Sequence, residues 1–245
     1  MARSLCNVNH TLSAIPKHVG LIMDGNRRWA RKRFMPAALG HVAGAKRVKA
    51  LVEACARLNI EHLTLFAFST ENWRRPEEEV SKLMDLFSSY LQKEVDEMEA
   101  NGVKLIVVGD KSKFSADLQG LIHRAEQQTR HNTKITLRVA ANYGGRWDII
   151  QAVKAWREAH PTSDIQNLNE DALASYLCTH EAPEMDLLIR SGGESRVSNF
   201  MLWQAAYAEL YFVETLWPDF TVKHFSDALE WFSKRDRRFG SAAPL

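Results

Sequence analysis

The segment HVGLIMDGNRRWA, residues 18–30, joins a short apolar run to a polar turn and a basic stretch. Residues 18–23 have the composition of a buried strand, and the next three residues, Asp24, Gly25 and Asn26, are types that favour turns. We therefore expect a strand that ends abruptly in a loop, with polar side chains directly after its last residue.

The rest of the chain repeats this alternation of apolar strands and amphipathic helices. Strands that alternate with helices along the chain are typical of an α/β fold. We expect a single domain with a mostly parallel central sheet, helices on both faces, and ligands at the carboxyl ends of the strands. The patterns predict strands at residues 18–23, 61–68, 104–108, 135–141 and 186–190, and helices at residues 42–58, 80–98, 116–129, 147–160 and 170–178.

Size and composition fit one globular domain. The chain has 245 residues, of which 45% are apolar and 25% are charged, so it can bury a substantial core. We expect a flexible leader at residues 1–17, one domain at residues 18–240 and a flexible tail at residues 241–245. The loop at residues 161–169 is the best internal boundary, and it is a weak one.

Charge, cysteine content and hydropathy indicate a cytoplasmic protein. The net charge of +2 is too small to imply a polyanion-binding surface from the total alone. Cys6, Cys55 and Cys178 form no CxxC pair, and their odd number argues against a disulfide framework. No stretch has the ~18 uninterrupted apolar residues of a membrane span, and the N-terminus lacks the apolar region of a secretory signal.

Polar and charged side chains collect in the loops after three predicted strands. On a parallel sheet these loops lie along one edge, where guanidinium groups, hydroxyls and glycine-rich backbone suit a phosphate or diphosphate. One acid among the cations, Asp24, suits a Mg²⁺ ion that bridges the protein to a diphosphate. The loops contain Asp24, Asn26, Arg27 and Arg28; Ser69, Glu71, Asn72, Trp73 and Arg75; and Arg190, Glu194, Arg196 and Ser198.

Each of these segments also has a purely structural interpretation. Residues 24–26 alone are compatible with a tight turn that caps a helix, and residues 191–193 with an ordinary flexible loop. The basic run RRWARKR, residues 27–33, is compatible with a solvated helix face or a nucleic-acid-binding patch. The apolar stripe of residues 80–98 is, by default, core packing.

Several other chemistries lack their motifs in the sequence. There is no GxxxxGK[ST] phosphate loop and no GxGxxG after the first strand, which disfavours nucleotide folds. The segment GESRV, residues 193–197, lacks the second glycine of a GxSxG elbow, and no HExxH or Cys/His cluster suits zinc. Phosphate chemistry without a nucleotide motif remains.

Seven segments of the sequence together resemble the cis-prenyltransferase family, and within it the bacterial enzymes that make undecaprenyl diphosphate. The segments follow one another in the family's order and span nearly the whole chain. They are HVGLIMDGNRRWA (18–30), GHVAGA (40–45), LTLFAFSTENWRRP (63–76), AANYGGRWDI (140–149), DLLIRSGGESRVSNFMLWQAAYAELYF (186–212), LWPDF (216–220) and RRFG (237–240).

The resemblance implies a Mg²⁺-dependent homodimeric transferase that condenses isopentenyl diphosphate successively onto farnesyl diphosphate with cis double bonds. The product would be undecaprenyl diphosphate, the precursor of a lipid carrier for cell-wall glycans. Asp24 matches the catalytic, metal-binding aspartate, Glu209 a second metal ligand, and Asn72 the residue often described as proton acceptor.

The resemblance also implies a set of substrate-binding residues. Those that match the allylic diphosphate site are Gly25, Asn26, Arg27, Arg28, Trp29 and His41. Those that match the second substrate loop are Ser69, Thr70, Glu71, Trp73 and Arg75. Those that match the isopentenyl diphosphate site are Arg190, Arg196, Val197 and Ser198, together with Arg238, which in the family belongs to an RxG element that reaches the neighbouring subunit.

Physical chemistry adds two expectations to the resemblance. An amide is a poor base, so we expect Asn72 to position substrate while a diphosphate oxygen or water accepts the proton. We expect the stripe of residues 80–98, with Phe66, Phe68 and Leu137, to line an apolar tunnel for the growing hydrocarbon. Three positions depart from the family pattern: Arg27 replaces a common Gly, Ala37 an Arg and Ser195 a His.

Two rival functions come from other classes. A non-catalytic partner subunit of the same family would typically have lost the aspartate that is present here as Asp24. The hypothesis of a nucleic-acid-binding protein depends on the run RRWARKR and predicts salt-dependent binding to nucleic acid. We expect no nucleic acid partner and at most transient, peripheral contact with the inner membrane face.

Overall fold

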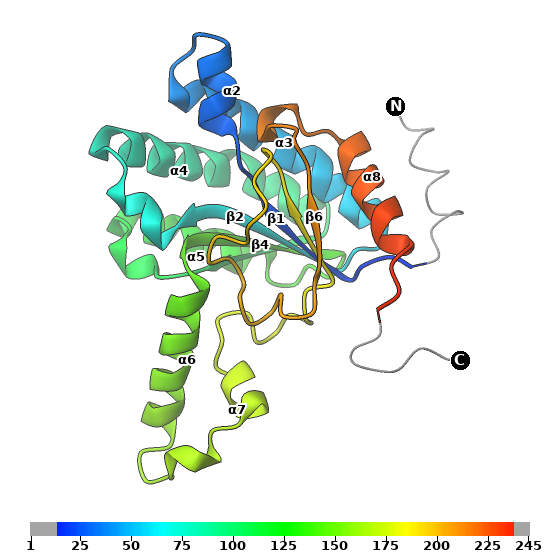
Figure 1. Ribbon diagram of the computed structural model, residues 1–245. Coiled ribbons are helices and arrows are strands. Elements are labelled where there is room, and N and C mark those ends of the chain that lie inside the picture. Colours follow the sequence, from blue (N-terminus) through cyan, green and yellow to red (C-terminus); the bar gives the residue numbers. More distant parts are fainter. Residues whose placement is uncertain (1–13, 238–245) are drawn as a thin grey trace, which may run out of the picture.

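A six-stranded parallel sheet forms the centre of the protein (Figure 1). The computed structural model describes residues 14–237, so most of the expected leader and all of the expected tail lie outside the described residues. The strands are β1 (His18–Ile22), β2 (His62–Ser69), β3 (Val103–Val108), β4 (Ile135–Tyr143), β5 (Leu187–Arg190) and β6 (Glu209–Phe212). Their order is β3-β4-β2-β1-β5-β6, and every neighbouring pair is parallel.

Helices connect the strands and confirm the predicted α/β organisation. They are α2 (Asn26–Lys32), α3 (Ala37–Arg57), α4 (Glu77–Ala100), α5 (Ala116–Thr129), α6 (Gly145–Ala159), α7 (Glu170–Ala174) and α8 (Val222–Ser233). The helix predicted at residues 116–129 has the predicted bounds, and the other predicted elements are present with ends shifted by a few residues. The described residues include no helix with the length and apolarity that a membrane span requires.

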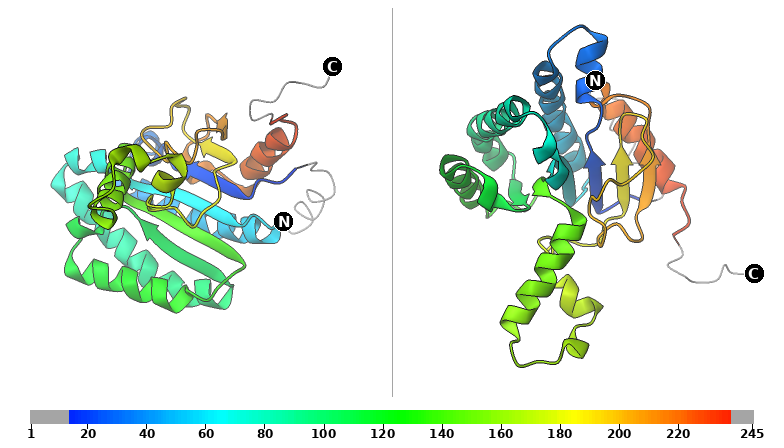
Figure 2. Two further views of the ribbon diagram at one scale, coloured as in Figure 1. Left: turned by 90° about the horizontal axis from the view of Figure 1, so that it is seen from below. Right: turned by 60° about the vertical axis from the view of Figure 1, so that its left-hand side comes forward.

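The two faces of the sheet are covered differently. On one face α3, α4, α5 and α8 bury a large apolar core that includes Leu21, Leu63 and Leu137. On the other face a smaller cluster around Tyr143, Leu188 and Phe200 is covered by the segment that leads from α7 to β6 and by the first turn of α6. Figures 1 and 2 show that most of α6, with α7, extends away from the sheet.

Two α-helices and one strand of the described chain are absent from the sequence predictions. β6 has only four residues, and α2 only seven, so neither carries enough periodicity to be recognised. α8 does carry a helical signal, because Phe225, Ala228, Leu229 and Phe232 are its buried residues and have the spacing of one face. That signal was available in the sequence and was missed.

Small residues bring α3 close to the loop after β1. A Cβ on Gly40 would stand 2.1 Å from the backbone oxygen of Asn26, and a Cβ on Gly44 would stand 2.3 Å from its side-chain oxygen. Gly25 has φ +107°, a backbone conformation that residues other than glycine rarely adopt. The glycines of GHVAGA therefore allow α3 to fix the position of Asn26.

A buried histidine lies at the opposite, amino-terminal edge of the sheet. His18 is fully buried, and its Nδ1 lies 2.8 Å from the Pro183 carbonyl oxygen, which can only accept a hydrogen bond. Nδ1 therefore donates, and Nε2, 2.8 Å from Thr64 Oγ1, accepts from that hydroxyl. Burial lowers the pKa of His18 to about 4, so the ring is neutral at pH 7.

Candidate active site

The site lies where the carboxyl ends of β2, β1 and β5 meet, as the sequence predicts. These three strands are neighbours in the sheet, and the chain leaves β1 toward α3 on one face and β5 toward residues 197–208 on the other. Ligands of parallel sheets bind at such a point, because loops that diverge leave a crevice between them. A cleft of about 790 Å³ is present there, which we call the polar cleft.

Asp24 and Arg190 form the floor of the polar cleft. The Nη2 atom of Arg190 donates to Asp24 Oδ2 at 3.0 Å, while its Nη1 donates to Ser198 Oγ at 2.7 Å and to the carbonyl oxygen of Arg196. The Arg190 side chain is only 5% exposed, and Arg28 Nη2 lies 3.2 Å from the same Asp24 oxygen. One carboxylate is therefore held between two guanidinium groups, with the loop after β5 tied to the same cluster.

Three buried polar atoms at this site have no hydrogen-bond partner among the described residues. They are Asn26 Oδ1, His41 Nε2 and Arg190 Nε. Buried polar atoms are nearly always hydrogen-bonded, so a group of unpaired ones in a cleft indicates a polar ligand. Burial and the neighbouring Arg75 guanidinium lower the pKa of His41 to about 4, so this ring is neutral at pH 7.

A second cleft of about 660 Å³ adjoins the first, and we call it the entrance cleft. Both clefts are lined by Met23, Asp24, Asn26, His41 and Arg75. The entrance cleft adds Gly25, Arg27, Arg28, Arg31, Phe34, Met35 and Ala37. Its cations outnumber its acids, which favours a polyanionic ligand.

Glu79 of α4 partly neutralises these cations. It lies 3.7 Å from Arg27 and 3.2 Å from Arg75, and 3.9 Å from His41 Nε2. Arg27, whose role the sequence left open, therefore points toward α4 while it lines the entrance cleft. Ala37, in the same cleft, provides no cation.

The loop after β2 presents Asn72 to the polar cleft. Asn72 Oδ1 accepts a hydrogen bond from the Ser69 backbone N–H at 3.2 Å and closes a capping box over residues 69–72. This contact fixes which end of the amide is the oxygen, so Nδ2 remains as a hydrogen-bond donor. Oδ1 thus holds the loop together, and a positioning role for Asn72 stays a prediction.

Asn199 is a site residue that the sequence analysis did not single out. Its Nδ2 donates to Glu71 Oε1 at 2.9 Å, and its Oδ1 accepts from the Arg146 backbone N–H at 2.9 Å. Its carbonyl oxygen accepts from the Gly145 N–H at 2.7 Å, and its φ is +62°. Asn199 thus joins the loops after β2, β4 and β5, and Arg146 also lines the polar cleft. The only sequence signal was its place inside the SNF segment after Arg196.

Asp24 suits Mg²⁺ as a single protein ligand. Its side chain is 30% exposed, and Oδ1 accepts no hydrogen bond from the residues that the structure describes. No group of three or more His, Cys, Asp or Glu side chains within residues 14–237 is arranged to hold a metal. Mg²⁺ usually keeps several waters and is bound through one or two carboxylates plus substrate phosphates, so this donor set fits it.

Most of the predicted substrate-binding residues lie together, but three do not line either cleft. Trp29 Nε1 donates to Asp219 at 2.7 Å, away from Asp24. Trp73 Nε1 donates to Asn142 at 2.7 Å and packs edge-on against Phe68. Those that line the clefts are Gly25, Asn26, Arg27, Arg28, His41, Ser69, Glu71, Arg75, Arg190, Arg196, Val197 and Ser198, and the predicted catalytic residues Asp24 and Asn72 line them as well. Thr70 is the third that lines neither, and Arg238 lies outside the described residues.

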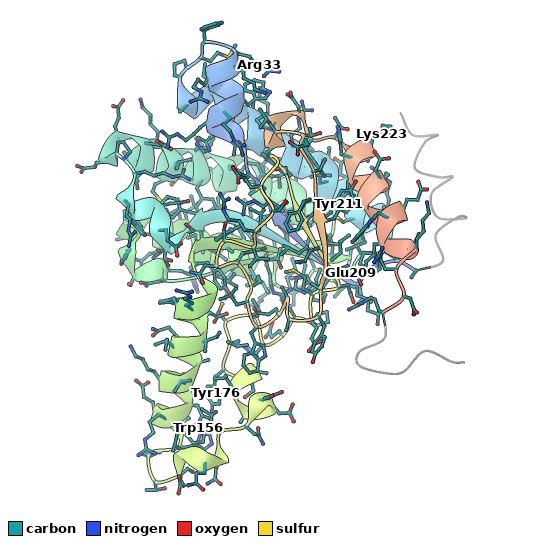
Figure 3. All side chains as sticks on the ribbon, in the orientation of Figure 1. Arg33, Trp156, Tyr176, Glu209, Tyr211 and Lys223 are labelled. Carbon is teal, nitrogen blue, oxygen red and sulfur yellow. The ribbon has the colours of Figure 1, made fainter. Side chains whose placement is uncertain are left out.

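Glu209 is separated from Asp24 within one chain. It begins β6 and pairs with Leu187 at the amino-terminal end of β5, whereas Asp24 contacts Arg190 at the other end of that strand. Its nearest cation is Arg235, at 3.5 Å, and Figure 3 labels it on β6 well away from α2. Within one protomer the two carboxylates therefore lie at opposite ends of β5, and the role of Glu209 as a second metal ligand stays a prediction.

An apolar cavity of about 130 Å³ continues from the two clefts into the space between α3, α4 and the sheet. Met23, Asn26 and His41 line all three spaces, and Ala67 and Phe68 line both the polar cleft and this apolar cavity. Ala67 is the extra residue of a bulge in β2, because Phe66 and Phe68 pair with the consecutive residues Ala140 and Ala141. The bulge places Ala67 at the mouth of the apolar cavity.

The expected tunnel lining is partly present. Phe68, Leu137 and much of the α4 stripe line the apolar cavity, namely Leu83, Met84, Phe87, Tyr90, Leu91 and Met98. Phe66 instead faces the other side of the sheet, where its ring stacks on Phe200 with centroids 4.5 Å apart. Val80 and Val95 do not line it.

Comparison with known proteins gives one consistent result. A family model described as "Putative undecaprenyl diphosphate synthase" matches residues 22–240. An isoprenyl transferase of Neisseria meningitidis serogroup A is 51% identical over 233 residues, which cover 95% of this chain and 92% of the relative. A ditrans,polycis-undecaprenyl-diphosphate synthase of Shewanella oneidensis, named as specific for (2E,6E)-farnesyl diphosphate, is 52% identical over 229 residues, with 93% and 83% covered.

A solved structure supports the same conclusion. Lavandulyl diphosphate synthase from Lavandula x intermedia, in complex with dimethylallyl diphosphate, is similar with a TM-score of 0.88 and 35% identity, covering 93% of this chain and 99% of that one. Because the family model and these relatives cover almost the whole chain, including every cleft-lining segment, the chain belongs to the undecaprenyl diphosphate synthase family of prenyltransferases.

Proposed function

We propose that this chain condenses isopentenyl diphosphate successively with farnesyl diphosphate, forms a cis double bond at each step, and makes a long-chain polyprenyl diphosphate such as undecaprenyl diphosphate. One observation carries the proposal: a cation-rich cleft around Asp24 and Arg190 opens directly into an apolar cavity. A substrate with a diphosphate head and a hydrocarbon tail needs both environments side by side. We take residues 18–240 as the catalytic domain.

The allylic diphosphate is assigned to the side of the polar cleft that adjoins the entrance cleft. Arg28 and Arg75 face that space, and the neutral His41 ring has an unpaired nitrogen there. These donors stabilise the charge that develops on the departing diphosphate when the allylic carbon–oxygen bond breaks. The apolar cavity beside them receives the hydrocarbon and keeps water from the cation.

Isopentenyl diphosphate is assigned to the side that Arg190, Arg196 and Ser198 line. Arg190 is fixed by Asp24 and Ser198, and its unpaired Nε is available to a diphosphate oxygen. Asn72 would donate its amide N–H to a diphosphate oxygen and thereby help to position the substrate. After the new carbon–carbon bond forms, a proton leaves to create the double bond, and a diphosphate oxygen or water accepts it.

Mg²⁺ is the proposed cofactor, with Asp24 as its protein ligand and phosphate oxygens and water as the others. When bound, it neutralises diphosphate charge in the cleft. Glu209 is proposed only as a ligand of a different ion from the one that Asp24 of the same chain binds. Removal of divalent cations with EDTA should abolish turnover, and added Mg²⁺ should restore it.

We further propose a homodimer that works in the cytoplasm and supplies a lipid precursor for cell-wall synthesis. Arg238 would reach the isopentenyl diphosphate site of the neighbouring subunit. The edge strand β6 exposes Leu210 to 40%, and Tyr207 beside it is 65% exposed, which supports a protein contact along this edge. Product formation that requires farnesyl diphosphate, isopentenyl diphosphate and Mg²⁺ together would test the proposed function.

A further inference from the structure

A fully exposed aromatic residue occupies a strained backbone position between α2 and α3. Phe34 is 99% exposed and has φ +55°. The Met35 N–H donates to the Ala30 carbonyl at 3.0 Å and the Phe34 N–H to the Arg31 carbonyl at 3.1 Å, which is the Schellman ending of a helix. Glycine usually occupies this left-handed position, because a side chain there is unfavourable. Since the ring of Phe34 packs against nothing in the described chain, it does not stabilise the fold.

Phe34 belongs to a surface that we call the tip patch, formed by Arg31, Lys32, Phe34, Met35 and Leu39. Met35 is 43% exposed and Leu39 48% exposed, so three apolar side chains within six residues of the chain are open to solvent. Figures 1 and 2 show α2 and the following turn extending beyond the sheet at the end opposite to α6 and α7. The tip patch is therefore accessible to a large flat partner.

The charge of the tip patch is positive and uncompensated. No Asp or Glu occurs between Asp24 and Glu53 in the sequence. Arg33 is neutralised by Asp219 at 3.3 Å and stacks over Trp29 at 4.1 Å. Arg31 and Lys32, by contrast, form no ion pair with any residue between 14 and 237. An anionic partner would thus meet free cations beside exposed apolar side chains.

The tip patch is continuous with the functional site. Arg31, Phe34 and Met35 also line the entrance cleft, which extends to Asp24 and Arg28. A partner that covers the tip patch would therefore lie at the mouth of that cleft.

We propose that the tip patch docks the protein on an anionic lipid bilayer. Aromatic and aliphatic side chains at a protein tip enter the boundary between headgroups and acyl chains, while arginine and lysine contact anionic headgroups. A second copy of the chain would present the same cations and be repelled in a symmetric contact. A nucleic acid would satisfy the cations but would leave the aliphatic side chains exposed. If the proposed function holds, docking presents the cleft to the apolar phase in which a polyprenyl product resides.

The test is co-sedimentation of the full chain with vesicles of phosphatidylcholine alone or mixed with phosphatidylglycerol, without any substrate. We expect binding to the mixed vesicles, weakened by salt, and little binding to phosphatidylcholine alone. Phe34→Gly should weaken binding about tenfold while it keeps or raises the melting temperature, because glycine suits the left-handed backbone. Lys32→Gln should weaken binding to the mixed vesicles about fivefold.

A matched control is Ile165→Ala, which shortens another exposed apolar side chain, 55% exposed and near α7 at the far end of the molecule. This control should bind vesicles as the parent does. The proposal is overturned if the parent binds neither kind of vesicle or if Phe34→Gly binds as well as the parent. It is equally overturned if Phe34→Gly changes the oligomeric state in light scattering but leaves vesicle binding unchanged. The same holds if the parent protein binds a DNA duplex more tightly than the mixed vesicles. Because no substrate is present, these outcomes are independent of the proposed reaction.

Discussion

The guanidinium of Arg190 lies 3.0 Å from the carboxylate of Asp24, and this contact joins the end of β5 to the loop after β1. Arg190 is almost fully buried, so its charge needs this acid when no ligand is present. The same Asp24 side chain is also the proposed metal ligand. Asp24 therefore connects two halves of the proposed site, the allylic side through Arg28 and the isopentenyl side through Arg190.

Replacement of Asp24 should slow turnover strongly, with little effect on folding if the change keeps an acceptor for Arg190. Asp24→Asn retains a side-chain oxygen for Arg190 Nη2 but loses the charge that binds Mg²⁺. We expect kcat to fall by roughly 10²–10³-fold, which is the usual rate loss when one charge-stabilising group is removed from an active site. Circular dichroism should match the parent. Asp24→Ala should be equally inactive but less stable, since it leaves Arg190 uncompensated. An Asp24→Asn enzyme with most of its rate would exclude Asp24 from the mechanism.

A larger side chain at Ala67 should shorten the product. Ala67 lies at the bulge in β2 where the polar cleft meets the apolar cavity, so the extra atoms of leucine would narrow the passage. Product lengths of Ala67→Leu and parent would be compared by reversed-phase thin-layer chromatography. The control is Ala43→Leu on α3, a position that lines neither cleft nor the apolar cavity. Equal product lengths in folded enzymes would mean that the hydrocarbon does not pass Ala67.

The protein should lose stability between about pH 6.5 and pH 4, and His18 should account for part of this loss, beside His41 and His62, whose pKa values burial also lowers to about 4. Burial lowers the pKa of His18 to about 4, whereas its unfolded value is 6.5, so in this range the unfolded chain binds the proton and the folded chain does not. Stability is therefore present above pH 6.5 and is lost as the pH falls toward 4. The full loss from this residue is about 3 kcal/mol.

Urea unfolding across this pH range measures the effect. His18→Asn keeps a donor for Pro183 and removes the titrating ring, so its midpoint should vary less with pH than that of the parent. His123→Gln, which removes an exposed histidine from α5, serves as the control and should follow the parent. Parallel profiles for His18→Asn and the parent would show that His18 is not responsible.

Mixed dimers test whether Arg238 serves the neighbouring subunit. Each dimer would pair one Asp24→Ala chain with one Arg238→Ala chain, both inactive as homodimers. If Arg238 acts across the interface, one site carries both lesions and the other carries none, so activity should return to about half per dimer. A confirmed heterodimer that stays inactive would place Arg238 in its own chain's site.

The sequence predicted which polar residues would gather at the carboxyl ends of the strands. Asp24, Asn72 and Arg190 come together because the ends of adjacent parallel strands meet at one edge, a consequence of topology alone. The direction of side chains was less predictable. Successive residues of a helix point about 100° apart, so Arg28 turns toward Asp24 while Trp29 turns toward Asp219.

Long-range contacts were the part that the sequence could not provide. The separation of Glu209 from Asp24 follows from β6, whose parallel pairing with β5 starts at the far end of that strand. The role of Asn199 depends on three loops that meet only in the folded chain. Neither relationship has a periodic or motif signal, because both arise from the packing of separate segments.

The most direct test of the account is the length and geometry of the product. The purified chain would be incubated with Mg²⁺, farnesyl diphosphate and labelled isopentenyl diphosphate, and the dephosphorylated products resolved by chain length and examined by NMR. The account predicts a long polyprenyl product in which every double bond formed by the enzyme is cis. A short product of a single coupling, newly formed trans double bonds, or no incorporation of label would contradict it.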